Sequence, residues 1–220
     1  TKRQRAFIAD ASHELRSPLA SLRTQLEVTI AHPQGTDAAD VAGEALKDVL
    51  ALEALTDDLL RLARMDSGDE PSPEQLDLSV LMDDVLSRRH ADRVPVELEG
   101  PATLLCFADP GSVAQVVINL IDNAVRHANS RVQVRLAAPA PGRSAASVTV
   151  MDDGPGIPTR DRERVFDRFV RLDSPRSRED GGTGLGLPIA RELARKQGGD
   201  VTVIDDGPGA AFQATLPTEP

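Results

Sequence analysis

The stretch QVVINLIDNAVRH, residues 115–127, decides the fold of the larger, C-terminal part of the chain. Its polar residues recur at i, i+4, i+7 and i+8, which places them on one face of a helix: Asn119, Asn123, Arg126 and His127. The other face is apolar: Val116, Leu120 and Ala124. Such a helix packs its apolar face on a sheet. Carboxamide oxygens are ligands that Mg²⁺ accepts beside phosphates, although two asparagines on an ordinary helix surface give the same pattern.

The segments around this helix alternate between helical and strand-like patterns. We expect helices at Leu78–His90, Ser112–Ala128 and Leu185–Gln197, and strands at Val94–Leu98, Thr103–Phe107, Arg131–Leu136, Ser147–Met151, Val201–Ile204 and Ala211–Leu216. This mixture predicts an α/β two-layer sandwich with a mixed sheet, over residues 76–220. The polar, proline-containing residues 67–75 are predicted to be a linker.

The N-terminal residues 1–66 predict an all-α helical hairpin. Apolar residues recur at steps of three and four over Phe7–Ile30 and Ala38–Asp66, with turn residues at 32–37 between them. Pro18 lies inside the first helix, where we expect a kink. The seam of the second helix is predicted at Ala45, Val49, Leu52, Thr56, Leu59 and Ala63. A hairpin cannot cover its own seam, so we expect a homodimer that forms a four-helix bundle.

Composition narrows the functional classes. The 220 residues carry a formal charge of −10 and only 2% aromatic residues, which disfavours nucleic-acid binding. A single cysteine, Cys106, excludes an internal disulfide framework and a thiolate metal cluster. No apolar run has the length of a membrane span, and the chain opens on Thr1-Lys2-Arg3. We expect a soluble piece, without membrane contact of its own, cut from a longer protein.

Two glycine segments carry further signals. Asp152-Asp153-Gly154-Pro155-Gly156 follows a predicted strand, where it forms either a ligand pocket or a plain turn. Residues 181–187, GGTGLGL, open a helix, where backbone amides favour an anion. The segment lacks the lysine of a Walker A loop and the preceding strand of a dinucleotide fold. The arginines between the two segments favour polyphosphate contact, but interleaved acids offer them ordinary partners.

The first helix contains a histidine outside the apolar seam. His13 is followed by Glu14, and Ser17 lies one turn further on the same face. A solvent-facing imidazole with an adjacent carboxylate is a candidate nucleophile with its base, although a lone surface histidine is the commoner explanation.

Taken together and in order, these motifs resemble the catalytic core of a sensor histidine kinase of a two-component system. HELRSPL resembles the phospho-acceptor box, NLIDNAVRH the N box, DDGPGIP the first glycine box, RVFDRFVRLD the F box and GGTGLGLPIA the second glycine box. The resemblance implies a dimerisation and histidine-phosphotransfer hairpin, then an ATP-binding domain of the gyrase, chaperone, kinase and mismatch-repair class. It also implies phosphoryl transfer from ATP to histidine, and then to an aspartate of a response regulator.

The same resemblance implies roles for individual residues. His13 is the phosphorylated residue and Glu14 its general-base partner. Asn119 and Asn123 hold Mg²⁺ and phosphates, with Arg126 at the usual basic position, and Asp152 accepts the adenine amino group. The remaining nucleotide contacts are assigned to His127, Gly154, Gly156, Arg171, Gly182, Thr183, Gly184, Leu185 and Gly186. Phe166 and Phe169 are expected to anchor the ATP lid.

Two departures from the family pattern qualify this assignment. Ser17 stands where threonine or asparagine is usual, which bears on phosphatase activity, and His127 replaces the usual aromatic residue. A gyrase-like ATPase is the rival enzyme, but it needs a glutamate base where this chain has Asn119. A scaffold that binds ATP without transferring it is the rival non-enzyme, against which the intact His13 argues. We expect the cytoplasmic portion of a membrane-anchored sensor.

Overall fold

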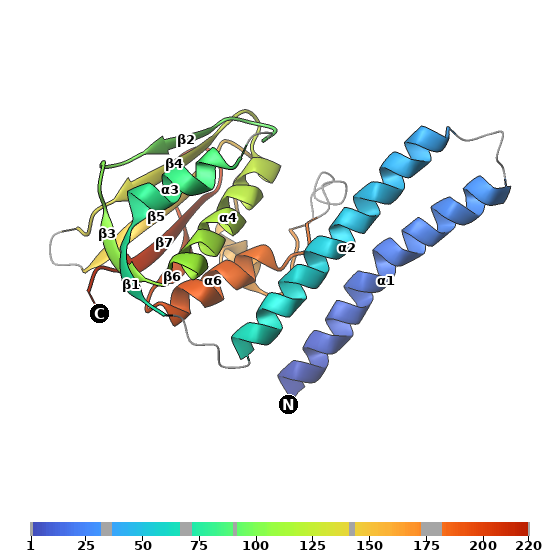
Figure 1. The fold of residues 1–220 in the computed structure, drawn as a ribbon, viewed down its shortest axis with the longest axis horizontal. Coiled ribbons are helices and arrows are strands. Elements are labelled where there is room, and N and C mark those ends of the chain that lie inside the picture. Colours follow the sequence, from blue (N-terminus) through green and yellow to red (C-terminus); the bar gives the residue numbers. More distant parts are fainter. Residues whose placement is uncertain are drawn as a thin grey trace. The chain divides into compact units, whose positions relative to one another are not determined.

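A computed structural model describes residues 2–31, 37–66, 72–89, 92–140, 144–172 and 182–219 (Figure 1). The chain divides into two compact units. Residues 1–68 and 174–185 make up the first, and residues 69–173 and 186–220 the second. None of the helices in the described ranges is both long enough and apolar enough to cross a lipid bilayer.

The first unit contains the predicted hairpin. Helix α1 spans Lys2–Ala31 and continues through Pro18, and α2 spans Ala38–Asp66. Five of the predicted turn residues, 32–36, lie outside the described part of the chain.

The predicted seam of α2 is confirmed in part. Its residues Ala45, Leu52 and Leu59 are half-buried, whereas Val49, Thr56 and Ala63 are exposed. The fully buried residues are the neighbouring Leu55 and Leu62. The helix is rich in leucine on several faces, so apolar spacing alone did not select the buried one. Several large apolar side chains of the hairpin stay exposed: Leu19, Leu26, Val28, Ile30, Leu46, Leu50 and Leu60.

The second unit is a mixed α/β sandwich, as predicted. Its main sheet has the strand order β2-β4-β5-β7-β6, in which only β2 and β4 are parallel. These strands are β2 (Val96–Glu99), β4 (Val132–Ala137), β5 (Ala145–Asp152), β6 (Asp200–Ile204) and β7 (Ala211–Pro217). A separate antiparallel pair joins β1 (Glu74–Asp77) to β3 (Leu105–Ala108). Strand β1 was not predicted, and it includes two residues that the sequence had placed in the linker.

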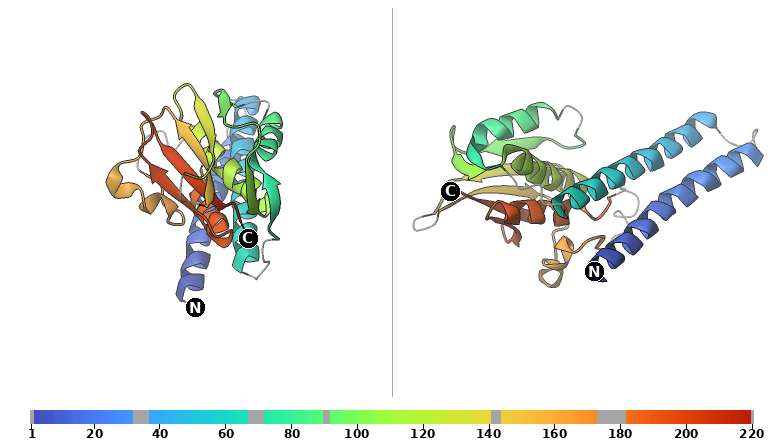
Figure 2. Two further views of the ribbon diagram at one scale, coloured as in Figure 1. Left: turned by 90° about the vertical axis from the view of Figure 1, so that its left-hand side faces the viewer. Right: turned by 60° about the horizontal axis from the view of Figure 1, so that its bottom comes forward.

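Helices cover one face of this sheet. Helix α3 spans Leu78–Ser87, α4 Pro110–His127 and α6 Gly186–Lys196. Helices α4 and α6 lie side by side over the strands (Figures 1 and 2). The segment between β5 and α6, predicted without regular structure, contains two short 3₁₀ turns, η1 (Thr159–Asp161) and η2 (Arg164–Phe166).

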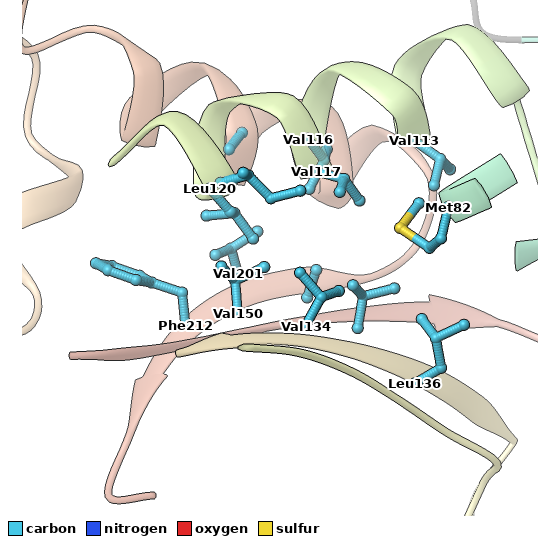
Figure 3. Close-up of a cluster of buried hydrophobic side chains, with 14 of the residues drawn as sticks. Met82, Val113, Val116, Val117, Leu120, Val134, Leu136, Val150, Val201 and Phe212 are labelled. Carbon is cyan, nitrogen blue, oxygen red and sulfur yellow. The ribbon is translucent and has the colours of Figure 1, made fainter. Parts of the chain in front are cut away.

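The core lies between α4 and the sheet. Val116, Val117 and Leu120 of α4 face Val134 and Val150 of the strands, and all five are essentially fully buried (Figure 3). The helix begins where the Asp109 carboxylate accepts from the amide of Ser112 (2.7 Å), with Pro110 in its first turn. Cys106 is also buried, which raises the pKa of its thiol to about 11 and makes it an inert core residue.

Candidate functional site

The polar face of α4 is placed as its periodicity predicts. Its residues Asn119, Asn123, Arg126 and His127 are all half-buried, while the opposite face is packed in the core. The Asn119 amide nitrogen donates to the carbonyl of Gly186, the first residue of α6 (3.1 Å). Asn119 therefore ties the middle of α4 to the start of α6.

The carboxamide oxygens of this face fit a hard cation in part. Asn119 Oδ1 accepts from Gln115 Nε2 (2.9 Å), which leaves one of its two lone pairs for another partner. Asn123, one turn later, has no side-chain hydrogen bond within the described residues. The described residues contain no group of three or more acidic, histidine or cysteine side chains placed to hold a metal. A divalent ion on this face would therefore depend on amide oxygens, phosphates and water.

Asp152, at the end of β5, is the most distinctive group of the site. Its side chain is 5% exposed, and its Oδ1 atom accepts from the amides of Gly154 (2.8 Å) and Ala210 (3.1 Å). Its Oδ2 atom is buried with no hydrogen-bond partner among the described residues. Burial raises the pKa of this carboxyl, against the two amides that lower it. A buried carboxylate oxygen without a donor is costly, so this position suits a ligand group that carries an N–H.

The backbone packs closely around this carboxylate. A Cβ atom at Gly154 would lie 2.3 Å from the carbonyl oxygen of His127, so only glycine allows this approach between the β5 end and the α4 end. Gly156 lies beside the carbonyl of Gly209. A Cβ atom at Gly209 would lie 2.2 Å from the carbonyl oxygen of Asp152. Gly209 thus forms one wall around Asp152.

Sequence reasoning missed Gly209 and Ala210. A signal was present, since residues 205–209 read Asp-Asp-Gly-Pro-Gly, the same five residues as 152–156. The two segments follow strands β6 and β5, and the amide of Asp152 also donates to the carbonyl of Ala210 (3.0 Å).

The second glycine segment is divided between the two units. Residues 182–185 group with the first unit, where the Thr183 hydroxyl hydrogen-bonds Asp58 Oδ2 of α2 (2.8 Å) and accepts from the amide of Leu185 (3.2 Å). Gly182 and Gly184 are half-buried, and Leu185 is fully buried. Gly186 belongs to the second unit and begins α6, one residue later than predicted.

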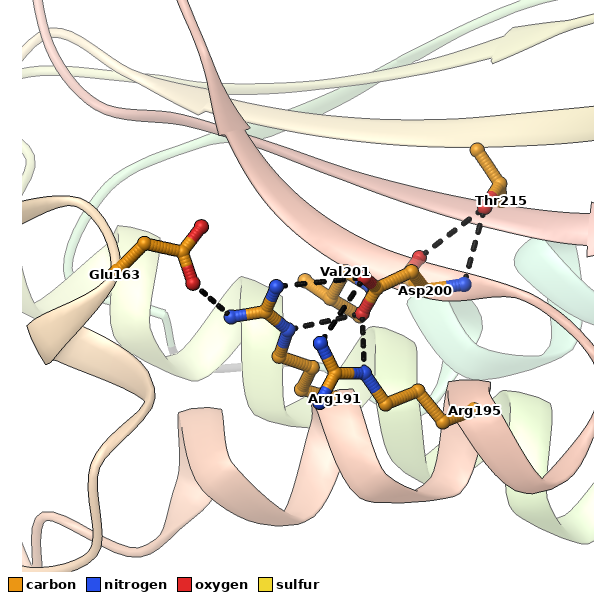
Figure 4. Close-up of polar contacts among 6 residues, drawn as sticks. All are labelled: Glu163, Arg191, Arg195, Asp200, Val201 and Thr215. Carbon is orange, nitrogen blue, oxygen red and sulfur yellow. Dashed lines mark hydrogen bonds and ion pairs between the residues drawn. The ribbon is translucent and has the colours of Figure 1, made fainter.

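Two arginines fix α6 on the sheet (Figure 4). Arg191 Nε and Arg195 Nε both donate to Asp200 Oδ1 of β6, at 2.9 and 3.0 Å. Arg191 also bonds Glu163 (2.7 Å), and its guanidinium lies 4.4 Å from the ring centroid of Phe166. That ring meets the buried Phe212 edge to face, with centroids 6.2 Å apart. Phe166 is therefore anchored to both α6 and the core.

Most arginines of the predicted cluster have acidic partners. Arg164 pairs with Asp161 (2.6 Å), Arg168 with Glu192 (3.7 Å), and Arg162 with Asp205. Arg171 is exposed and has no partner among the described residues, while Arg176 and Arg178 lie outside them. Phe169 has a left-handed backbone, with φ of 62°.

On α1, His13 and Ser17 are both exposed, as their position outside the seam predicted. Glu14 lies in the same helix, but its side chain is outside the described part of the structure. An exposed imidazole is accessible to a phosphoryl donor or acceptor.

Two family models match the chain. Residues 3–68 match the His Kinase A (phospho-acceptor) domain, and residues 108–220 match the histidine kinase-, DNA gyrase B- and HSP90-like ATPase. The chain belongs to the sensor histidine kinases. Their phospho-acceptor model covers α1 and α2, and their ATPase model covers the part that contains α4, β5 and α6.

Named histidine kinases are similar over nearly the whole chain. Sensor protein CiaH of Streptococcus pneumoniae is 32% identical over 98% of this chain and 50% of its own length. The histidine-protein kinase/phosphatase MprB of Mycolicibacterium smegmatis is 34% identical over 98% of this chain and 46% of its own length. The chain thus spans about half the length of these relatives. The structure of histidine kinase AdeS of Acinetobacter baumannii, 24% identical, shares the fold with a TM-score of 0.73, over 94% of this chain and 98% of that one.

Proposed function

We propose that this histidine kinase core binds ATP at Asp152, phosphorylates its own His13, and passes the phosphoryl group to an aspartate of a response regulator. The observation that carries the proposal is the buried Oδ2 of Asp152, which has no hydrogen-bond partner within the part of the chain that the structure describes. The exocyclic amino group of adenine supplies the missing N–H. Guanine presents a carbonyl oxygen at the same place, which a carboxylate repels, so the site favours ATP over GTP.

The polyphosphate and Mg²⁺ are assigned to the polar face of α4 and the glycine segment. Asn119 and Asn123 offer amide oxygens to the ion, and Arg126 and His127 add donors at the end of the helix. Gly182, Thr183, Gly184, Leu185 and Gly186 offer backbone amides to the phosphates, and Arg171 offers its unpaired guanidinium to the γ-phosphate. Bound Mg²⁺ neutralises the charge that develops on the phosphate oxygens.

The first step is an in-line displacement. A ring nitrogen of His13 attacks the γ-phosphorus, the bond from that phosphorus to the bridging oxygen breaks, and ADP leaves. Glu14 accepts the proton that the imidazole loses, so the product is a phosphoramidate with a neutral imidazole ring and an anionic phosphoryl group. In the second step the carboxylate oxygen of the regulator attacks the phosphorus, the P–N bond breaks, and the imidazole of His13 leaves as it takes the proton back from Glu14. Positioning of the reactants and charge neutralisation supply most of the rate.

The hairpin is assigned a second role as the dimer interface. The hairpin leaves several large apolar side chains exposed, and a second copy in a four-helix bundle would cover them. We assign residues 1–66 to dimerisation and phosphotransfer, 67–75 to the linker and 76–220 to ATP binding. The whole protein is proposed to be a membrane-anchored sensor, with this portion in the cytoplasm.

The test is incubation of the purified chain with γ-labelled ATP and Mg²⁺, followed by treatment of the product with acid and with base. Label on wild type that is lost in acid and kept in base indicates a phosphoramidate. The His13→Ala variant should take up no label and yet bind nucleotide as wild type does, since its change lies in the hairpin. Acid-stable label, or label on His13→Ala, would overturn the proposal.

A phosphatase activity at Ser17 is proposed in addition, and MprB, whose name includes phosphatase, supports it. Ser17 lies exposed one turn after His13 and has a hydroxyl that orients a water toward the phospho-aspartate of the regulator. Serine lacks the methyl group that restricts the threonine rotamer, so the activity should be weak. Ser17→Ala should abolish it and Ser17→Thr should raise it, with His13 phosphorylation unchanged. The measurement is the decay rate of the phosphorylated regulator with Mg²⁺-ADP, and an undiminished rate for Ser17→Ala would refute the role.

A further inference from the structure

The C-terminal end of α4 and the turn after it, residues 125–131, are bound by two charged side chains from distant parts of the chain. Helix ends leave carbonyl groups without intrahelical partners, and turns leave amides unpaired. Here Arg93, which precedes β2, binds carbonyl groups of residues 125–128, and Asp153, which follows β5, binds amides of residues 129–131.

Arg93 donates hydrogen bonds to the carbonyl groups. Its Nη2 atom donates to the carbonyl oxygens of Val125 (2.9 Å), Arg126 (3.4 Å) and Ala128. A cation at a helix C-terminus is also favoured by the helix dipole. One guanidinium thus closes the last turn of α4.

Asp153 accepts hydrogen bonds from the amide groups. Its Oδ1 atom accepts from the amides of Asn129 (2.7 Å), Ser130 (3.0 Å) and Arg131 (3.3 Å), and its Oδ2 atom accepts from the Ser130 hydroxyl. These donors hold the pKa of the Asp153 carboxyl well below its usual range, with the Ser130 hydroxyl as the largest cause. The carboxylate is therefore ionised at any pH where the protein functions.

The turn lies next to the groups that the proposed function uses. Asp153 stands between Asp152 and Gly154, and Gly154 packs against the carbonyl of His127, the last residue of α4. A shift of the turn therefore moves the end of the asparagine-bearing face relative to the buried Asp152 carboxylate. Misplacement by about 1 Å is enough to weaken a bound group considerably.

We propose that Arg93 and Asp153 form a two-sided clamp on residues 125–131, and that this clamp positions the adjoining Asp152 carboxylate for the adenine base. The inference rests on the proposed ATP site. Neither residue is assigned a contact with the nucleotide, so both are positioning residues. Because Asp153 adjoins Asp152, their effect should be larger on base recognition than on phosphate binding.

The experiment measures ADP and GDP affinity by calorimetry for wild type, Arg93→Ala, Asp153→Ala and the double variant. Each single change should weaken ADP binding by about three- to tenfold, less than the loss of a direct charge-assisted hydrogen bond to the nucleotide, because the effect reaches the site only through the turn. The GDP affinity should change less, so the ratio of ADP affinity to GDP affinity should decrease in each variant. The double variant should lose less than the product of the two single losses, because both changes release the same turn.

Controls separate this role from general destabilisation. Arg88 and Asp84 form an exposed ion pair on α3 (2.8 Å), and Arg88→Ala and Asp84→Ala should leave both affinities unchanged. Arg93→Lys keeps the positive charge but lacks the planar guanidinium, so its ADP affinity should lie between those of wild type and Arg93→Ala. This variant replaces Arg93→Ala in the experiment if Arg93→Ala does not fold. Equal loss of ADP and GDP affinity, or no loss, would overturn the clamp while the ATP site stands. A wild type that binds no ADP would overturn the proposed function itself.

Discussion

The sequence Asp-Asp-Gly-Pro-Gly occurs twice, at 152–156 and at 205–209, and the two copies do different things. In the first, Asp152 is buried and one of its oxygens has no partner. In the second, Asp205 is exposed and pairs with Arg162 (2.9 Å), while Asp206 pairs with Arg135 (2.7 Å). Identical residues thus give a ligand group in one place and surface ion pairs in the other. Burial and the available donors, not the motif, decide the chemistry.

The second copy nevertheless supports the first. Its last residue, Gly209, packs on the Asp152 carbonyl, and the next residue, Ala210, exchanges two hydrogen bonds with Asp152. The antiparallel pairing of β5 with β7 brings these residues together, because Met151 lies opposite Ala211.

The largest effect is expected from a methyl group at Gly209. Gly209→Ala would place a Cβ atom 2.2 Å from backbone, which the sheet must move to accept. We expect a loss of about 3 kcal/mol in the free energy of unfolding, and nucleotide binding too weak to measure. Gly207→Ala is the matched control within the same segment, since nothing lies within 4 Å of its Cβ position and only backbone strain at φ of 114° is added. Urea denaturation and ADP titration compare the two, and normal ADP affinity in Gly209→Ala would contradict the packing argument.

A smaller effect on thermal stability is expected when the first aspartate of each copy is replaced by asparagine, and its sign should be opposite in the two copies. Burial raises the pKa of Asp152, so the folded state holds its proton more tightly than the unfolded chain, and ionisation destabilises the fold above that pKa. Asp152→Asn should therefore raise Tm at pH 8 by about 2–4 °C, and the gain should shrink as pH falls through the raised pKa. The ion pair with Arg162 lowers the pKa of Asp205, so its ionised form stabilises the fold. Asp205→Asn should lower Tm slightly, and the loss should vanish in acid.

Scanning calorimetry from pH 8 down to pH 4 measures both variants. A lower Tm for Asp152→Asn at pH 8 would show that the carboxylate is satisfied in the free protein. The hypothesis that only a ligand N–H satisfies Asp152 Oδ2 would then be wrong.

Local sequence patterns predicted much of this fold. Helix α4 and strands β4, β5 and β7 were expected from the spacing of their apolar residues. Apolar residues that recur every three to four positions mark the buried face of a helix, and those that recur at every second position mark the buried face of a strand. Strand β1 was missed because four residues after a proline-containing stretch carry too short a pattern. In α2, leucines on several faces concealed which stripe is buried.

The site was predictable where a single segment carries it, as with the α4 face and the exposure of His13. It was not predictable where residues far apart in the sequence meet. The Asp152 environment depends on Ala210, 58 residues away, and the turn after α4 depends on Arg93, which lies 35 residues before Ala128. Such partners follow from strand pairing, which no local pattern reports.

The most direct test of the account is an ATP titration of wild type, Asp152→Asn and Asp205→Asn under identical conditions. Asparagine at 152 replaces the acceptor oxygen with an N–H₂ group that opposes the adenine amino group. The account predicts an ATP affinity lower by about 1–3 kcal/mol for Asp152→Asn, the cost of an unsatisfied buried partner, and an unchanged affinity for Asp205→Asn. Equal affinity of Asp152→Asn and wild type would contradict the assignment of Asp152 as the adenine-binding carboxylate.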